Sequence, residues 1–566
     1  MALRNRLALL AAAGALGFCG LPAGVAMAQD AHPLSGRAYE HAAQAYAALN
    51  RQDLVAAERE ARAAVERAPE NPNAVRLLVD VLARAGNGPA AMEIADQAIA
   101  RGVQDSGLHA QRGYLRAAAG RPEAAMEDFR TALATPGLAA ERVRELRLSL
   151  ADQALAAGRP AEVLDALDPY AGDTGYAVNA RRGFALFALE RYADAAAAFE
   201  AASAAAATPE DRRTADKGWA QSAAALGDQD RVRGLVRTLA DGTAGCDPDL
   251  IYLLMRANDD AGAIAMADAP GCAGSLTPGV QADLGYATKR LHRNREAAGR
   301  FTAALDGYRG AGSAVLDPMA EFGLRREVDT LVREFGLTGG YAWRTGRSDA
   351  GGGTAAQLIL EGYWQPEWFG FQDGRVFQAY ARLSNDAPGA GSPAPGTDSL
   401  LGAVGVRYKP LADLNLVLAA ERHIAFGDAA TSDWLVRAGY SGGFGLDLNP
   451  VEQTWTFEQH YAEAGYYLQQ ERALFSAEAR YGLTTKLFGS QTLTGSAYLG
   501  AGLSYDQAEP MPFAAGIGPG LSLRYWFRET AHRAPASYVQ VDFGYRVPVT
   551  ASDRAGGIVL QVHVSF

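Results

Sequence analysis

The segment GIVLQVHVSF, residues 557–566, decides the fold of the second half of the chain. Apolar residues stand at every second position from Ile558 to Phe566, and Gln561, His563 and Ser565 lie between them. A period of two residues predicts a β-strand with one apolar and one polar face. The same alternation fills residues 538–547 and 521–528.

The composition changes near residue 334, from Ala, Leu, Arg and Glu to Gly, Tyr, Trp, Phe and Val. The alternating segments are about ten residues long, the length that crosses a bilayer at a tilt near 45°. Tyr and Trp cluster near their ends, which is typical of aromatic girdles. We therefore predict an antiparallel transmembrane β-barrel over residues 334–566, surrounded by outer-membrane lipid. A soluble β-domain also alternates and is the alternative.

Twelve strands are predicted, an even number as bacterial barrels require, although fourteen or sixteen also fit. Because lipid offers no hydrogen bonds, the sheet must close on itself. The segments Asn385 to Asp398 and Gly442 to Thr454 are the candidate extracellular loops. The predicted strands start near Phe335, Ala355, Val376, Leu400, Leu414, Trp434, Tyr461, Ala473, Ala497, Leu521, Tyr538 and Gly557.

The first half has helical periodicity and an internal repeat over residues 37–330. Ala57, Ala91 and Ala125 recur at intervals of 34 residues. This period with small residues at fixed offsets is the signature of tetratricopeptide (TPR) repeats, in which each repeat is a helix pair. Six or seven repeats are expected, forming an α-solenoid that binds peptides or other proteins.

Within these repeats, a glycine precedes a small residue by twelve positions, and a phenylalanine follows. Small side chains let the paired helices approach closely, and the phenylalanine fills the space beside the next pair. The sets are Gly113, Ala125 and Phe129; Gly183, Ala195 and Phe199; and Gly285, Ala297 and Phe301.

The N-terminus has the features of a secretory signal. Arg4 and Arg6 precede the apolar run 7–18, and Ala26-Met27-Ala28 forms an A-x-A cleavage site. We predict a signal peptide over residues 1–28, with an N-terminal anchor as the alternative. The helical repeats would then lie in the periplasm.

Export also bears on the cysteines. If Cys19 leaves with the signal peptide, Cys246 and Cys272 remain. In an oxidising compartment they are expected to form a disulfide that closes a loop of about 27 residues and stabilises it by roughly 3 kcal/mol. Two separate thiols are the alternative.

Charge and motifs exclude several function classes. The chain of 566 residues has a net charge of -11 and a pI near 5.4, which argues against nucleic acid as a partner. It has no H-E-x-x-H motif and no convincing Ser/His/Asp arrangement, and its His residues lack metal-ligand spacing. We therefore expect no enzymatic activity, no cofactor and no metal.

Several stretches in the second half are similar to a known domain. They are NLVLAAER (415–422), SDWLVRAGYS (432–441), YAEAGYYL (461–468), GPGLSLRYWFRE (518–529) and APASY (534–538). Together they resemble the C-terminal domain of the bacteriophage N4 adsorption protein A family, from near residue 335 to Phe566. The terminal Phe566 also resembles the signal by which the barrel assembly machinery recognises outer-membrane barrels.

The resemblance implies a periplasmic TPR scaffold attached to an outer-membrane barrel and paired with an inner-membrane glycosyltransferase in exopolysaccharide secretion. The outer-membrane exporters of cellulose and poly-N-acetylglucosamine share that layout. We therefore expect export or surface display of a polysaccharide through the barrel, while the repeats recruit periplasmic or inner-membrane proteins. The alternative is a surface receptor, for phage adsorption or adhesion, with a plugged barrel.

Charged residues on the polar faces of the predicted strands are the candidates for lining the lumen. They would either hydrogen-bond sugar hydroxyls or pair across the lumen as structural salt bridges. The candidates are Arg344, Glu361, Arg382, Arg407, Glu421, Arg437, Glu463, Glu478, Arg480, Arg524, Arg528, Asp542 and Arg546.

Overall fold

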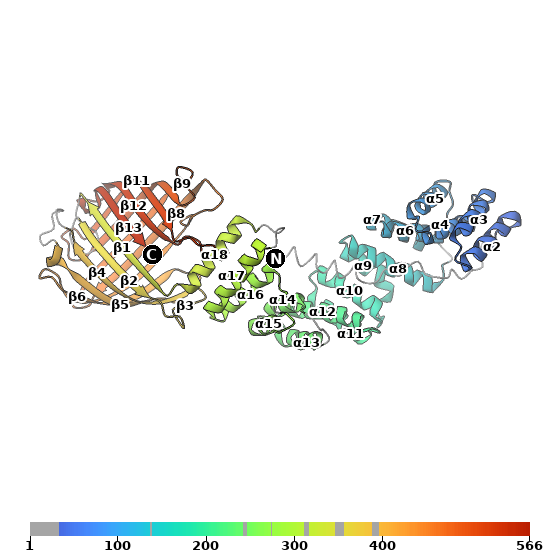
Figure 1. Ribbon diagram of the computed structural model, residues 1–566, viewed down its shortest axis with the longest axis horizontal. Helices are drawn as coiled ribbons and strands as arrows, with labels where there is room; N and C mark the ends of the chain where they lie inside the picture. The colour runs from blue at the N-terminus through green and yellow to red at the C-terminus, as the bar shows by residue number, and fades with distance from the viewer. Residues whose placement is uncertain are drawn as a thin grey trace. The chain divides into compact units, whose positions relative to one another are not determined.

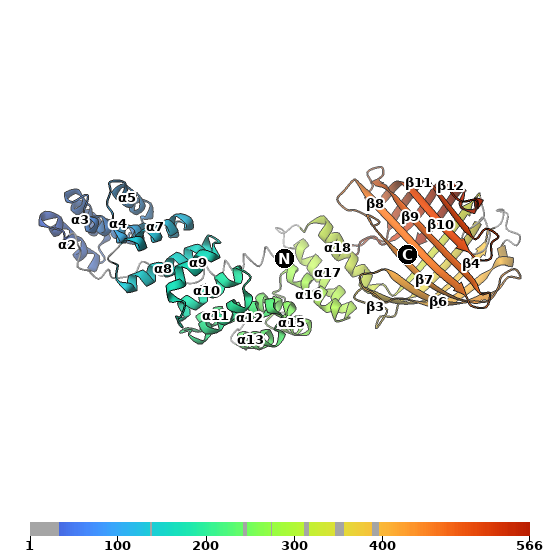
Figure 2. The same ribbon diagram turned by 180° about the vertical axis from the view of Figure 1, so that it is seen from behind.

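The computed structural model describes residues 33–135, 138–241, 246–272, 274–310, 316–345, 356–387 and 396–566. The predicted signal peptide, residues 1–28, and most of the predicted loop 385–398 lie outside these ranges. The chain divides into two compact units between Asp259 and Asp260. Figures 1 and 2 show the helices of the first half and the barrel of the second.

The first unit consists of helices. They are α2 (Gly36–Asn50), α3 (Leu54–Arg67), α4 (Pro72–Arg84), α5 (Gly88–Ala100), α6 (Ser106–Ala118), α7 (Pro122–Ala134), α8 (Ala140–Ala156), α9 (Pro160–Leu167), α10 (Tyr176–Ala188), α11 (Tyr192–Ala204), α12 (Pro209–Leu226), α13 (Gln229–Asp241) and α14 (Pro248–Arg256). The second unit begins with α15 (Asp260–Ala267), α16 (Pro278–Arg290), α17 (Asn294–Gly310) and α18 (Pro318–Val332). Every helix in the described part of the chain is too short or too polar to cross a membrane.

Local sequence signals start these helices. The carboxylate of Asp53 accepts a hydrogen bond from the N–H of Ala56, and that of Asp105 accepts one from Leu108. Such N-caps satisfy backbone donors that the first helical turn leaves free. Proline occupies the first turn of α4, α7 and α12, where its missing N–H costs nothing.

Consecutive helices pack in pairs, as the TPR prediction requires. Within the described residues seven such pairs occur, from α2/α3 to α12/α13 and then α16/α17, with the short helices α14 and α15 between the last two pairs. The fold predicted for this half, a TPR-type helical array, is confirmed.

The repeated glycines and phenylalanines form the contacts between helices. Phe199 is fully buried, and its ring lies between Gly183 of α10 and Gly218 of α12. A Cβ added at Gly183 would lie 2.8 Å from the Phe199 ring, and one added at Gly218 would lie 2.5 Å from it. Gly113 with Phe129 and Gly285 with Phe301 repeat this contact. The repeated glycine and phenylalanine positions in the sequence thus mark where the helices approach each other most closely.

The second unit continues as an antiparallel barrel. Its strands are β1 (Phe335–Arg344), β2 (Ala356–Trp364), β3 (Phe371–Gln372), β4 (Arg375–Asp386), β5 (Leu401–Lys409), β6 (Leu416–Ala425), β7 (Trp434–Phe444), β8 (Thr454–Tyr467), β9 (Arg472–Lys486), β10 (Leu493–Asp506), β11 (Phe513–Phe527), β12 (Ser537–Pro548) and β13 (Gly557–Ser565).

Twelve long strands close the barrel, and β3 is a two-residue addition beside β4. Each strand from β4 to β13 pairs with the next, β13 pairs with β1, and β2 pairs with both β1 and β4. The ring therefore has no free edge among the twelve strands, and the predicted strand number is confirmed.

Side chains alternate across the barrel wall. On β11, Leu521, Leu523 and Tyr525 are 60%, 45% and 51% exposed, whereas Trp526, the residue after Tyr525, is 5% exposed. The apolar outward face fits hydrocarbon, and the inward face carries the polar side chains.

Because neighbouring strands are antiparallel, successive turns lie at alternating ends of the barrel, and the number of strands between two turns (the strand parity) decides whether they share an end. The chain enters β1 directly after α18, so the start of β1, Phe566 and the turns after β2, β5, β7, β9 and β11 share one end, here called the helical end. The segment Gly442 to Thr454 contains the turn after β7 and lies at the helical end. The prediction that this segment and Asn385 to Asp398 are both extracellular loops was wrong, because three strands separate the two segments and an odd number reverses the end.

Replacing Gly183 by alanine should destabilise the first unit. The new methyl group would press on the Phe199 ring, and overpacking of this kind costs about 1–3 kcal/mol. The matched control is Gly234→Ala in α13, where nothing lies within 4 Å of the added Cβ, so the helix gains stability from the better propensity of alanine. Thermal unfolding followed by the helical circular dichroism signal should shift down for the first variant only. A downward shift of equal size in both would contradict this packing.

Candidate functional site

The candidate site is the inner wall of the barrel. Nine of the thirteen predicted lumen residues line its two large cavities: Arg344, Arg382, Arg437, Glu463, Glu478, Arg480, Arg524, Asp542 and Arg546. Glu361, Arg407 and Glu421 belong to ion pairs on the same wall. Arg528 follows the last residue of β11 and is exposed, with a positive φ of 65°. The alternation of inward and outward side chains ends with the strand, so it does not place Arg528 in the lumen.

Glu421 on β6 is the centre of the first cluster. Its carboxylate is fully buried and accepts a hydrogen bond of 2.6 Å from the Tyr380 hydroxyl. His423 lies 2.9 Å from the same carboxylate, and the guanidinium groups of Arg382 and Arg437 bind it from β4 and β7. A buried carboxylate needs partners of this kind, because its desolvation would otherwise be costly.

Two further ion pairs extend this cluster around the wall. Arg437 also binds Glu463 on β8 at 3.2 Å, and the Tyr461 hydroxyl donates to Glu463 at 2.7 Å. On the other side, Arg407 binds Glu361 at 2.7 Å. Acids and bases are therefore paired along the wall from β2 to β8.

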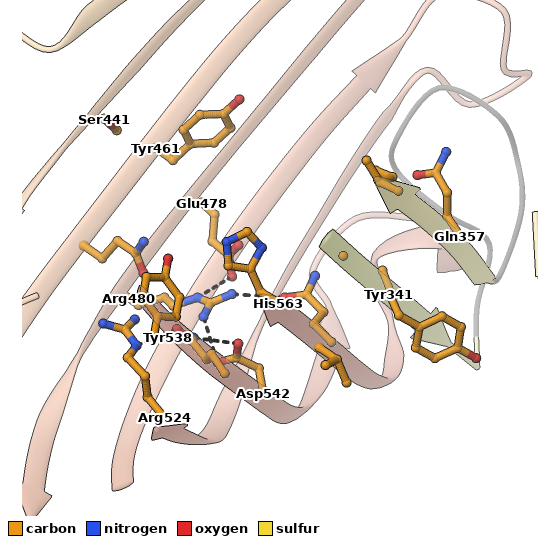
Figure 3. Close-up of a pocket in the computed structure, with 17 residues that line it drawn as sticks. Tyr341, Gln357, Ser441, Tyr461, Glu478, Arg480, Arg524, Tyr538, Asp542 and His563 are labelled. Carbon is orange, nitrogen blue, oxygen red and sulfur yellow. Dashed lines mark hydrogen bonds and ion pairs between the residues drawn. The ribbon is translucent and has the colours of Figure 1, made fainter. Parts of the chain in front are cut away.

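Arg480 on β9 is the centre of a second cluster. It binds Glu478 at 3.0 Å and Asp542 at 3.1 Å, and Asp542 lies on β12, so the contact reaches past β10 and β11. Arg546 binds Glu478 as well. Figure 3 shows Arg480 between Glu478 and Asp542, with dashed lines joining them.

The space in the barrel is divided by this second cluster. A cavity of about 670 Å³ and one of about 410 Å³ are both lined by Glu478, Arg480 and Asp542. These ion-paired side chains form a layer that borders both cavities. Gly340 and Ala342 on β1 leave space on the opposite wall, where Gln357 and Gln561 supply uncharged polar groups.

Sequence reasoning missed several polar members of the site. Tyr380, His423 and Tyr461 stand on the same alternate positions as the predicted Arg382, Glu421 and Glu463, so strand parity alone would have found them. Across the described residues, no three His, Cys, Asp or Glu side chains are grouped to hold a metal ion.

One motif matches a catalytic spacing without its structural context. Residues 439–443, GYSGG, fit the G-x-S-x-G pattern of hydrolase nucleophile elbows, in which the serine sits on a sharp turn from strand to helix. Ser441 instead lies inside the continuous strand β7, and the Asn415 side chain donates a hydrogen bond to it.

The predicted cysteine pair lies in the helical half. Cys246 and Cys272 are both disulfide-bonded. Cys246 directly precedes the Asp247 N-cap of α14, and Cys272 is buried.

Comparison with known proteins bears on the barrel. Residues 391–562 match the family described as "Bacteriophage N adsorption protein A C-term". The family resemblance is confirmed. The "Bacteriophage adsorption protein A" of Escherichia coli (strain K12) is 24% identical over 190 residues, which are 33% of this chain and 19% of that protein. The match thus covers about a fifth of the curated relative's length.

Two solved structures are similar to part of the chain. The structure titled "Functional Characterization of Pseudomonas Aeruginosa pilF" is 16% identical with a TM-score of 0.31, covering 39% of this chain and 97% of that one. A tetratricopeptide repeat protein from Parabacteroides merdae is also 16% identical, with a TM-score of 0.24, covering 52% of this chain and 99% of that one. The closed barrel and the adsorption-protein match together indicate an outer-membrane protein.

Removing the Glu421 carboxylate should weaken the barrel. Glu421→Ala leaves Arg382, Arg437 and His423 without their shared buried anion, and breaking a buried ion pair typically costs about 3–5 kcal/mol. On gels, the folded barrel migrates differently from the heat-unfolded chain. The band of the folded form should disappear at a lower temperature for the purified variant than for the parent chain.

The matched control is Glu458→Ala, which removes an acid that is half-exposed and forms an ion pair with His460. An exposed pair of this kind contributes roughly 0–1 kcal/mol. If both variants lose folded mobility at the same temperature, the Glu421 cluster does not stabilise the barrel.

Proposed function

We propose that the barrel is the outer-membrane pathway of a system that exports or displays a polysaccharide. The observation that carries this proposal is the polar, charge-balanced interior, whose two cavities of about 670 and 410 Å³ are both bordered by the ion-paired side chains of Glu478, Arg480 and Asp542. Side chains that are held by hydrogen bonds can exchange them with a passing polymer, whereas a folded plug would have to leave as a unit.

The chemistry of the wall favours an uncharged or zwitterionic glycan. Guanidinium groups, carboxylates and the hydroxyls of Tyr380 and Tyr461 offer donors and acceptors for sugar hydroxyls. Because the Arg and Glu side chains are paired, neither sign of charge dominates the lumen. A strongly charged polymer would have to break these pairs to pass.

The helical repeats suit a recruiting role in the periplasm. Helix pairs in a solenoid present extended surfaces to proteins, and the partners proposed here are periplasmic or inner-membrane proteins, including a glycosyltransferase that makes the polymer. The barrel assembly machinery would insert the barrel. We propose no enzymatic activity for the chain itself.

Replacing Arg480 and Arg546 together by serine should change ion conduction. The two bases are the counterions of Glu478 and Asp542, so their loss widens the layer between the cavities and leaves excess negative charge there. In planar bilayers we expect a larger current and a shift of selectivity towards cations. A neutral maltooligosaccharide should reduce the current of the parent chain by occupying the same space.

The matched control is Arg422→Ser. The Arg422 guanidinium lies over the Trp434 ring at 5.8 Å, and its strand position places it on the outer face of β6. Current and selectivity should stay at the parent values. Unchanged conduction in the Arg480/Arg546 variant would count against a pathway through this lumen.

A second candidate function is a surface receptor. The similarity to the bacteriophage adsorption protein of Escherichia coli favours it. Replacement of the turn after β6, residues 426–433, with a short Gly-Ser turn should then abolish phage adsorption to Escherichia coli cells that carry this chain in place of the relative, and leave bilayer current unchanged. Adsorption that persists in the turn variant would argue against recognition at this turn.

A further inference from the structure

The turn between β7 and β8, residues 445–453, folds into the barrel. The Leu446 carbonyl accepts a hydrogen bond of 2.9 Å from Arg524, a lumen-facing residue of β11. In the sheet, β9 and β10 lie between β8 and β11. The backbone of the turn therefore reaches this side chain through the interior, at the helical end of the lumen.

Apolar contacts hold the turn inside the wall. Leu448 is 6% exposed and packs with Trp455 of β8 and Trp526 of β11, both of which are buried. The Trp455 indole N–H donates to the Gly445 carbonyl at 2.9 Å, which fixes the start of the turn. Below the turn, the space down to Arg480 shrinks to a void of about 30 Å³. A void of that size holds about one water molecule.

Helix α18 reaches the same turn from outside the barrel. The Arg326 guanidinium binds both oxygens of Asp447, with Nε 2.8 Å from Oδ2. The same guanidinium lies 5.3 Å from the Phe322 ring centre and 5.7 Å from that of Trp526. Such a two-bond Arg–carboxylate pair fixes orientation as well as distance.

A different contact holds α18 to the barrel. Arg325 binds Glu529 at 2.7 Å and donates to the carbonyls of Thr530 and Arg533 in the turn after β11. This attachment does not involve the β7–β8 turn. The Arg326–Asp447 pair can therefore open while α18 stays docked.

We infer that the β7–β8 turn is a gate at the helical end of the lumen, and that the Arg326–Asp447 ion pair keeps it closed. This inference rests on the proposed function, since a gate requires the lumen to be a pathway. Because Arg326 belongs to a helix that follows the repeats directly in the chain, a partner that binds there and draws the Arg326 guanidinium away from Asp447 would release the turn and open the β8–β11 side of the lumen.

The experiment compares bilayer currents of the full-length chain in four forms. Arg326→Ala and Asp447→Asn each remove the ion pair, and each should raise the current by about twofold or more as the gate opens. The exchange Arg326→Glu with Asp447→Arg should restore a closed turn and bring the current back towards the parent value. Arg181→Ala is the matched control, because it removes a two-bond Arg–Asp pair between α10 and Asp152 of α8, within the first unit.

A fifth form separates the gate from the pathway. Residues 446–452 are replaced with a Gly-Ser turn, and its folding is checked by heat-modifiable mobility. If this form raises the current but the two point variants do not, the ion pair is not the closing contact. If the turn variant leaves the current unchanged while the Arg480/Arg546 variant changes the current, the turn is not a gate, but the lumen remains the proposed pathway. If none of these forms changes the current, both the gate and the proposed function are overturned.

Discussion

The pairing of β1 with β13 is the constraint on which the barrel depends. It converts a row of strands into a ring in which each long strand has two neighbours. In lipid an unpaired edge would leave backbone donors and acceptors without partners, at a cost of several kcal/mol each. Closure also produces an inside, and only an inside can hold a carboxylate as buried as Glu421 beneath an apolar outer surface.

Much of the fold could be predicted because period-two and period-34 patterns follow directly from strand and repeat geometry. The prediction was least accurate where those patterns fade. Strands β8, β10 and β11 begin at Thr454, Leu493 and Phe513, ahead of the predicted Tyr461, Ala497 and Leu521. Residues 513–520 read FAAGIGPG, and such small residues hide the alternation although the backbone still pairs. The prediction placed Gly442 to Thr454 and Asn385 to Asp398 at the same end of the barrel, which was wrong, because loop composition does not encode strand parity.

The candidate site was predictable by residue type but not by partner. Alternation places Glu421, Arg382 and Arg437 on the inner face, yet their meeting depends on the register of the four strands from β4 to β7, and register follows from side chains along the whole barrel. The contact between Arg480 and Asp542 depends further on the curvature of the closed ring. Arg528 shows the limit of alternation, since the pattern continues past the residue at which the strand ends.

The ladder between β1 and β13 also has a consequence for biogenesis. Tyr341 pairs with Val562, at nearly opposite ends of the barrel segment. Loop closure over so long a segment is slow, and the first strand stays without its partner while the ribosome makes every strand between them. The helix pairs need only neighbours a few dozen residues away and can fold as they emerge. During export the unclosed strands must therefore be shielded from one another, and their dependence on a chaperone should far exceed that of the helices.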